Sequence, residues 1–535
     1  MSRHRLIKRV SVFIIFALLA APTVGAANLP LPAPEVTSSV TARDLKKHLS
    51  FLASDELGGR YTLSQGNRIA ARYLASELES YGYRGAARDG SFFQRVPLSY
   101  RNVKIDKSSL TLNAGGAKQS FKYADDFASE TPVGLNLSGG MVFVGYGITS
   151  PKIGRDDYKG LDVKGKIAVA LGGLSDALKK AGFDEEKQIE AASAAGASTL
   201  ILISPPVYMA NWAQIKSFIM RESATLPPPT SAGKEAPAIY AGPELAKALA
   251  KAMGKEEAYL MHPKSEDVRP QAINAAGEIK VEVEVKEAPP AYNVAGVLEG
   301  GDARLKDEYV VFSSHYDHLK SKENGEVYNG ADDDGSGTVS VLEIAQAFAV
   351  GPRAKRSVLI IFHTGEEMGL LGSQFNADYE PVVPLEKLVA DFNIDMIGRS
   401  RPAGDNDVRD RELTDKDSVY VIGADKLSTE LNRISEQTNA ETTRLRFDYT
   451  YNDEAHPQQF YYRSDHYNYA KHGIPIIFYF TGVHRDYHMP TDDIEKIDFE
   501  KMERISRMIL ATGWRVANLD HRLVVDKKAP APVGR

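Results

Sequence analysis

The residues with the clearest chemical potential are three consecutive aspartates, Asp332, Asp333 and Asp334, in the stretch NGADDDGSG at positions 329–337. Adjacent carboxylates repel one another, so a turn that holds them close together needs a positive charge nearby at neutral pH. Flanking glycines would let the backbone bend around that charge. Because the chain has no cysteine, a metal held here must take its ligands from His, Asp and Glu.

Further residues of this kind accompany strand-like segments in the second half of the chain. The apolar runs YVVFSSH, SVLIIFH, LVADFNID and IPIIFYF alternate with helical stretches. This alternation predicts an α/β fold in which a mostly parallel mixed sheet is covered by helices on both faces. Ligands in such sheets bind at the carboxyl ends of the strands. The strands end in, or lead to, His315 with Asp317, Glu366 with Glu367, Asp395, and His488.

These motifs, in this order, resemble a known family, the co-catalytic di-zinc aminopeptidases of clan MH, of the secreted bacterial leucyl aminopeptidase type. The shared patterns are H-x-D, GADD-x-SG, GEE, N-x-D-M and YH-x-P, and the similarity extends over nearly all of residues 43–520. The resemblance implies the zinc exopeptidase fold. It also implies two Zn²⁺ ions, for which Mn²⁺ or Co²⁺ could substitute, since hard oxygen ligands with two imidazoles suit all three.

The same resemblance assigns a role to each motif residue. The metal ligands would be His315, Asp332, Glu367, Asp395 and His488. Asp332 would bridge the two ions, and the Asp332–Asp333 peptide bond would be strained or cis. Glu366 would be the general base that activates a shared water, and Asp317 would hold the second ring nitrogen of His315.

Other readings of the same residues are weaker. Residues 332–343 loosely fit an EF-hand calcium loop that ends at Glu343, but the preceding segment is a poor entering helix. Ser464, Asp465 and His466 have the residue types of a hydrolase triad, yet neighbours in sequence rarely reach triad geometry. His363 closes a buried strand and is expected to be a core residue. Tyr487 is either an oxyanion donor or a packed tyrosine.

Changes in residue composition and hydrophobic pattern divide the chain into segments. Residues 43–105 are helical and begin the peptidase domain, with two amphipathic helices interrupted at Gly58 and Gly59. Residues 106–285 are β-rich and resemble a protease-associated (PA) domain, and residues 286–522 form the catalytic domain. We expect this insert to cap the active site; a docking surface is the alternative. Residues 27–42 are interpreted as a linker and residues 523–535 as a flexible tail.

The amino-terminal segment indicates export. A basic start, an apolar run from Val10 to Ala21 and a small-residue site before Ala27 predict a signal peptide over residues 1–26, with no stable membrane span after cleavage. We therefore expect a bacterial periplasmic or extracellular protein. A net charge of −6 gives no electrostatic reason to bind nucleic acid.

The resulting prediction is an enzyme, a secreted metallo-exopeptidase that hydrolyses the amino-terminal peptide bond of peptides. Its water would be bridged by two zinc ions and deprotonated by Glu366. A carboxypeptidase or dipeptidase on the same scaffold remains open, because the ligand set does not say which end of the peptide is held. A single-zinc glutaminyl cyclase and a non-catalytic PA-bearing receptor fit less well, since none of the five ligand positions is lost.

Overall fold

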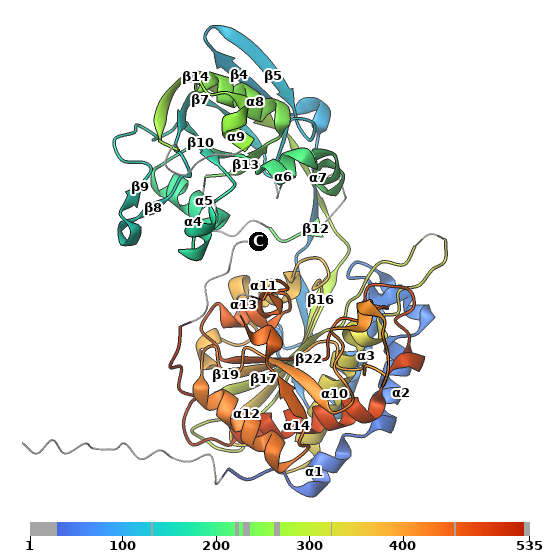
Figure 1. Cartoon of the computed structure of the whole chain (residues 1–535). Coiled ribbons are helices and arrows are strands. Elements are labelled where there is room, and N and C mark those ends of the chain that lie inside the picture. The colour runs from blue at the N-terminus through green and yellow to red at the C-terminus, as the bar shows by residue number, and fades with distance from the viewer. Residues whose placement is uncertain are drawn as a thin grey trace, which may run out of the picture.

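A computed structural model describes residues 29–129, 132–219, 224–227, 236–261, 268–322, 324–453 and 456–528. The chain builds two large sheets, each with its own apolar core (Figure 1). One has nine strands and is formed mainly by residues that follow position 290, and the other has eight strands and is formed by residues 109–281. The predicted signal peptide lies outside the described residues.

The helices have the following bounds: α1 Pro34–Ser39, α2 Ala42–Leu52, α3 Gln65–Ser80, α4 Asp176–Lys180, α5 Glu185–Ala194, α6 Pro206–Ala210, α7 Trp212–Ile219, α8 Pro243–Ala252, α9 Glu257–Met261, α10 Gly337–Val350, α11 Leu371–Gln374, α12 Thr429–Glu441, α13 His466–Ala470 and α14 Phe499–Ala517.

The strands are β1 Arg84–Gly85, β2 Phe93–Val96, β3 Ser99–Val103, β4 Ser109–Ala114, β5 Ala117–Lys122, β6 Phe127–Ala128, β7 Leu135–Phe143, β8 Thr149–Ser150, β9 Arg155–Asp156, β10 Ile167–Leu171, β11 Thr199–Ile203, β12 Ala224–Thr225, β13 Ala238–Ala241, β14 Gln271–Val281, β15 Val283–Glu287, β16 Ala291–Leu298, β17 Tyr309–His315, β18 Ser357–His363, β19 Leu388–Ile394, β20 Ser418–Ile422, β21 Arg446–Asp448 and β22 Ile476–Phe480.

The larger sheet is mixed, with a parallel centre. Its order is β1-β16-β18-β17-β19-β22-β20-β21, with β2 also paired to β16. Strands β18, β17, β19 and β22 run parallel to one another, whereas β16 and β20 pair antiparallel on either side of them. The four parallel strands are the four apolar runs identified in the sequence, so their carboxyl ends meet at one edge of the sheet. The α/β class with a mixed sheet is therefore confirmed.

Alternate side chains of the central strands enter two different cores. Phe312 of β17 packs in the cluster formed with α2, α3, α10, α12 and α14. Val311, its neighbour, packs in the cluster on the other face, which includes Tyr469 of α13 and Phe460. Because both faces are covered, the strands are buried along nearly their whole length, as expected for a parallel sheet between helix layers.

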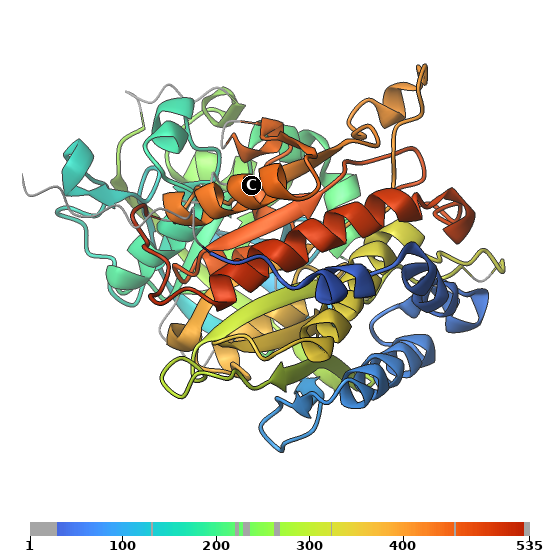
Figure 2. The ribbon, with the colours of Figure 1, turned by 90° about the horizontal axis from the view of Figure 1, so that it is seen from below.

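Helix α14 crosses the face of the sheet between α12 and α10, and it lies close to β17 (Figure 2). Its amino terminus is capped by Asp498, whose Oδ1 accepts a hydrogen bond from the Lys501 amide at 3.1 Å. Gly513 lies directly against the ring of Phe312. A Cβ atom at Gly513 would lie 2.3 Å from Phe312 Cζ, so only glycine permits this approach.

The smaller sheet has the order β5-β4-β14-β7-β10-β11-β13-β6. Its strands β7, β10, β11 and β13 are parallel, and β14 and β4 are antiparallel to their neighbours. A three-stranded sheet, β12-β3-β15, lies along the chain segments that connect the two large sheets. The expected insert boundaries, 106 and 285, stay predictions; the eight-stranded sheet begins at Ser109 and its strand β14 ends at Val281.

Both terminal segments of the described chain are more ordered than expected. Residues 34–39, assigned to a linker, form α1, and Val36 is fully buried in the core of the larger sheet. At the other end, Leu523 is buried in that same core and the Asp526 amide donates to the Leu427 carbonyl. Among the residues described, no helix combines the length and apolar character needed to cross a membrane.

We predict that Gly513→Ala lowers the free energy of unfolding by about 1–3 kcal/mol, the usual cost of inserting a methyl group into a packed core. The measurement is chemical denaturation followed by circular dichroism. Glu500→Ala on the exposed side of the same helix is the control, and a change within about 0.5 kcal/mol is expected for it. Equal stability of Gly513→Ala and the wild type would contradict the close packing of α14 on β17.

Candidate metal centre

The candidate site lies where the central parallel strands end. His315 is the last residue of β17, Asp395 directly follows β19, and Glu366 and Glu367 lie in the loop after β18. The aspartate-rich turn, residues 331–336, precedes α10 in the same place. His488 arrives in the loop after β22. The sheet topology therefore brings together segments that are up to 173 residues apart in sequence.

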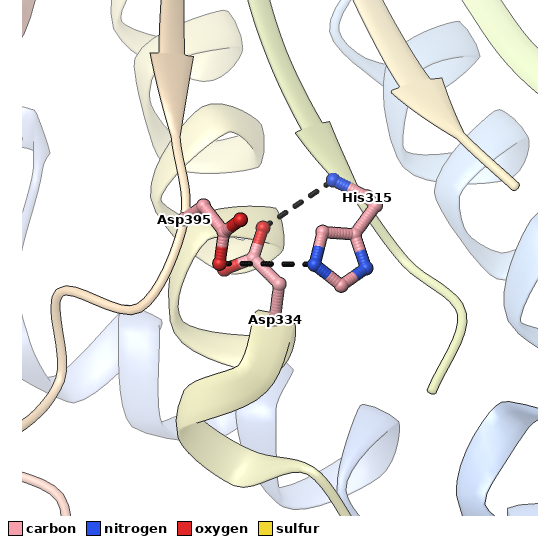
Figure 3. A group of neighbouring side chains, drawn as sticks. All are labelled: His315, Asp334 and Asp395. Carbon is pink, nitrogen blue, oxygen red and sulfur yellow. Dashed lines mark hydrogen bonds and ion pairs between the residues drawn. The ribbon is translucent and has the colours of Figure 1, made fainter. Parts of the chain in front are cut away.

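One group of ligand-type atoms surrounds the ring of His315. Its Nε2 lies 3.4 Å from Asp333 Oδ1, 3.7 Å from Asp395 Oδ1 and 3.8 Å from Glu366 Oε2. Figure 3 shows the ring and the Asp395 carboxylate facing each other across this space, with Asp334 beside them. Burial opposes protonation of His315, but the carboxylates of Glu366 and Asp395 outweigh it and raise its pKa well above the ordinary value.

A second group adjoins the first through Asp333. Nε2 of His488 lies 3.1 Å from Asp333 Oδ2 and 3.1 Å from Glu367 Oε2. On the other side of Glu367, Nδ1 of His318 lies 2.7 Å from Oε1. Burial raises the pKa of Asp333, yet the imidazoles around it hold that pKa well below the ordinary value. Asp333 thus faces both groups, with one oxygen toward each.

Asp333, not Asp332, occupies the position between the two groups, which corrects the residue assigned from the motif. The Asp332 carboxylate points elsewhere, accepting from the Gly398 amide at 2.6 Å and lying 3.1 Å from His484 Nε2. The cis peptide bond is Asp333–Asp334 rather than Asp332–Asp333. Three identical side chains in a row could not be told apart by sequence, because the backbone path decides which one points into the site.

Asp334 braces the turn instead of facing the open site. Its carboxylate accepts hydrogen bonds from the backbone amides of Gly337 at 2.9 Å and Met396 at 3.1 Å. It also accepts one from the His315 amide at 3.3 Å (Figure 3). Burial and the nearby Asp395 raise its pKa well above the ordinary value. This single side chain therefore ties the start of α10 to the ends of β17 and β19.

Two residues that sequence reasoning did not single out hold the aspartate turn from outside. The guanidinium of Arg60, which is 1% exposed, donates to the carbonyls of Asn329 and Gly330 at 2.5 and 2.9 Å. Oδ2 of buried Asp492 accepts from the amides of Asp332 and Asp333 at 3.0 and 3.1 Å. Arg60 is therefore part of the positive charge that the three aspartates require. Nothing in the sequence places it there, since it lies 270 residues before Gly330.

Several buried polar atoms at the site have the chemistry of cation ligands. Nε2 of His315, Oδ2 of Asp333 and Oε1 of Glu367 have no hydrogen-bond partner within the described part of the chain. Leaving such groups unpaired in a protein interior costs about 1–3 kcal/mol each. A divalent cation would satisfy the carboxylates and the unprotonated ring nitrogens together, so the donor set fits a metal of the zinc type.

The two remaining predicted site residues, Asp317 and Glu366, lie beside these groups. Asp317 Oδ1 accepts from the Glu366 amide at 3.2 Å, and Oδ2 accepts from Thr62 Oγ1 at 2.8 Å. His315 Nδ1 lies 3.1 Å from the Asp317 backbone carbonyl and 3.7 Å from its carboxylate, so the ring is oriented mainly through the main chain. Burial raises the pKa of Glu366 well above the ordinary value.

A pocket with a largely apolar wall opens onto the candidate metal-ligand side chains. It is lined by Asp333, Glu366, Asp395, Met396, Phe460, Arg463, Phe478, Phe480, Val483, Tyr487 and His488. Phe460 contributes to the pocket from the segment before α13, and β22 contributes through Phe478 and Phe480. Tyr487 stacks on His488, with ring centroids 3.8 Å apart, so it lies at the edge of the site.

The other candidates have different roles. Ser464 Oγ donates to Asp395 Oδ2 at 2.8 Å, whereas His466 Nε2 lies 2.8 Å from the Tyr461 carbonyl, so the SDH segment is not assembled as a triad. His363 is fully buried, with its Nε2 3.2 Å from Tyr469 Oη. Glu343 points into the helix layer, where its Oε1 lies 3.2 Å from His48 Nε2, and so it is not part of the aspartate turn.

Comparisons with known proteins find similarity mainly in the second half of the chain. Residues 293–513 match peptidase family M28. Aminopeptidase YwaD of Bacillus subtilis is 24% identical over 264 residues, which cover 48% of this chain and 52% of that protein. Probable leucine aminopeptidase 2 of Aspergillus oryzae is 28% identical over 262 residues, covering 48% and 47%. The chain thus spans about half the length of these curated relatives.

Among solved structures, an aminopeptidase from Aneurinibacillus sp. strain AM-1 matches with a TM-score of 0.47 and 19% identity over 94% of this chain and 99% of that one. BSAP, a zinc aminopeptidase from Bacillus subtilis, matches with a TM-score of 0.43 and 20% identity over 92% and 99%. The segment that matches peptidase family M28, residues 293–513, contains the parallel strands β17, β18, β19 and β22 and all the candidate metal ligands of the site.

Proposed function

We propose that this protein is a metallo-aminopeptidase that removes amino-terminal residues from peptides, using two zinc ions held at the carboxyl edge of the larger sheet. The observation that carries the proposal is the apolar pocket that opens directly onto a cluster of paired carboxylates and imidazoles. The family match of residues 293–513 and the names of the relatives support a peptidase that takes peptides as substrates.

The proposed ligands follow from the two groups around Asp333. His315 and Asp395 would hold one ion, and Glu367 and His488 the other, with one oxygen of Asp333 directed to each. Asp333 thereby takes the bridging role first expected of Asp332. Bound divalent ions would lower the pKa of a water molecule and polarise the scissile carbonyl.

The protein's own residues would direct the proton. Glu366 is adjacent to the ligand Glu367 but faces the His315 side, with its Oε2 3.8 Å from His315 Nε2. Its amide is held by Asp317, which fixes the loop. We propose that Glu366 takes a proton from the attacking water and delivers it to the departing amine, as general acid–base catalysis requires.

The charge around the pocket favours the amino terminus of a peptide. Glu366, which the proposed ligand set leaves free of metal, presents a carboxylate to the pocket, and a protonated α-amine would be attracted to it. Apolar side chains, among them Met396 and Phe480, would accept the first side chain of the peptide. An apolar first residue is therefore the proposed preference.

A dipeptidase is the second candidate, and Arg463 is the observation that favours it. This residue lines the same pocket, and its guanidinium carbon lies 4.6 Å from the centroid of the Phe460 ring. Nη1 donates to Gln458 Oε1 at 3.1 Å. An arginine at this place could pair with the free carboxylate of a short peptide.

We further propose that the insert acts as a cap over the site and that the chain is exported. Ala224 and Leu226 of the insert pack in one apolar cluster with Leu371 and Phe375, which follow the Glu366–Glu367 loop. Figure 1 shows α11 and α13 on the side of the larger sheet that faces the smaller one. The resemblance of the insert to a PA domain and the signal-like pattern of residues 1–26 support this part of the proposal.

The proposed function predicts that Glu366→Gln lowers kcat by about 10²–10⁴-fold while leaving zinc content unchanged, because the variant keeps the shape of the base but cannot accept a proton. The assay measures hydrolysis of leucine anilide, amino-blocked leucine anilide, a dipeptide and a tetrapeptide, with chelator and zinc add-back. Cleavage only of substrates with a free amine supports the aminopeptidase. Restriction to dipeptides would favour the second candidate, and cleavage of blocked substrates would refute the amino-terminal preference.

The assignment of the bridging carboxylate predicts different outcomes for two neighbouring substitutions. Asp333→Asn should reduce bound zinc sharply, because it removes the charge that both groups share, whereas Asp332→Asn should retain the wild-type zinc content. Elemental analysis after dialysis measures this, with circular dichroism to confirm folding. Loss of zinc in Asp332→Asn alone would show that the motif-based assignment was right after all.

A larger side chain in the pocket wall should change which first residue of the substrate is preferred. Val483→Phe should reduce kcat/KM for leucine and phenylalanine anilides by about tenfold relative to alanine anilide, since a filled pocket discriminates against bulk by about 1–3 kcal/mol. Val408→Phe, at a residue that is 74% exposed, is the control and should leave the ranking unchanged. An unaltered ranking in Val483→Phe would mean that the first side chain binds elsewhere.

A further inference from the structure

His318 is a third imidazole at the site, and neither the motif analysis nor the proposed ligand set includes it. It follows His315 by three residues, in the segment HYDH that leaves β17. Its side chain is fully buried, and neither of its ring nitrogens has a hydrogen-bond partner within the described residues. A buried imidazole with both nitrogens unpaired is costly unless something absent from the structure satisfies it.

The geometry around His318 is that of ligands converging on one point. Nδ1 lies 2.7 Å from Glu367 Oε1 and 3.7 Å from Asp333 Oδ2. Despite the short distance, the pair is not aligned as a hydrogen bond, because both Nδ1 and Oε1 count as unpaired. Two atoms that are close but not directed at each other are expected when both are directed at a common cation.

The surrounding residues hold the ring in this orientation. A Cβ atom at Gly330 would lie 2.5 Å from two ring carbons of His318, so the ring occupies space that any other residue at 330 would fill. The rings of His318 and His488 meet edge to face, with centroids 5.8 Å apart. Both imidazoles therefore approach Glu367 from different sides, His488 at Oε2 and His318 at Oε1.

We propose that His318 is a metal ligand through Nδ1 and completes the site formed by Asp333, Glu367 and His488. The inference rests on the proposed metal centre and deepens it. It makes the two sites unequal, with a second imidazole only on the Glu367 side. A site with two imidazoles selects zinc over harder ions such as magnesium, whereas the His315 side, richer in oxygen, selects less strongly.

The alternative role for His318 is a hydrogen bond that only orients Glu367. Two substitutions separate the roles. His318→Ala removes both a ligand and a hydrogen-bond donor, whereas His318→Gln keeps an amide donor of similar reach but is a poor zinc ligand. A ligand role therefore predicts that the two variants behave alike, and an orienting role predicts that glutamine restores wild-type binding.

The experiment titrates zinc into the metal-free full-length protein in competition with a chromogenic chelator. For both His318→Ala and His318→Gln, one site should weaken by more than the roughly 10–100-fold typical of losing an orienting partner, and the other should keep its affinity. His48→Gln is the matched control. His48 is also a buried histidine, but its partners are Tyr73 and Glu343 in the helix layer. Its zinc affinities should equal those of the wild type.

The outcomes distinguish the inference from the proposed function. Wild-type affinity in His318→Gln, or in both variants, overturns the ligand role while leaving the metal centre intact. Failure of the wild-type protein to bind zinc overturns both. Circular dichroism melting of all four proteins shows whether weaker binding reflects unfolding, and weakening of both sites together in a folded His318→Gln would also refute a role confined to one site.

Discussion

The repulsion among carboxylates at one sheet edge is the constraint on which the rest of this structure depends. Asp333, Asp334, Glu366, Glu367 and Asp395 converge there, and all are largely removed from water. In such a place, like charges raise each other's pKa unless positive charge or hydrogen-bond donors compensate. The protein supplies backbone amides to Asp334 and imidazoles to Asp333, and the atoms left unpaired mark where divalent cations would complete the compensation.

The scaffold meets this constraint by placing each charged group at the end of a stiff element. Strands β17, β18 and β19 are buried on both faces, so their carboxyl ends are fixed by packing rather than by the site itself. The close contact between Gly513 and Phe312 fixes α14 against β17 on the helix-covered face of the sheet. Outside the site, Arg60 and Asp492 hold the aspartate turn through its backbone, which leaves the Asp333 carboxylate free to face both groups of ligand-type atoms.

The same arrangement separates chemistry from recognition. Carboxylates and imidazoles lie at the strand ends, whereas the pocket wall comes from later loops and from β22, including Phe460, Phe478 and Val483. Arg463 lines the same pocket, where its guanidinium lies over the Phe460 ring. Variation in these wall residues would change the proposed specificity without moving the candidate metal ligands, because the two sets come from different segments of the chain.

The sequence by itself determined the fold class, the four parallel strands and the positions of His315, Glu366, Glu367, Asp395 and His488 at strand ends, because apolar runs and the residues that close them are local features. It could not decide among Asp332, Asp333 and Asp334, since their side-chain directions depend on a turn whose path is set by distant partners such as Asp492. Nor could it select Arg60 or His318. Only the tertiary structure brought these residues to the site, because burial and contact between distant segments, unlike periodicity, leave no local signal in the chain.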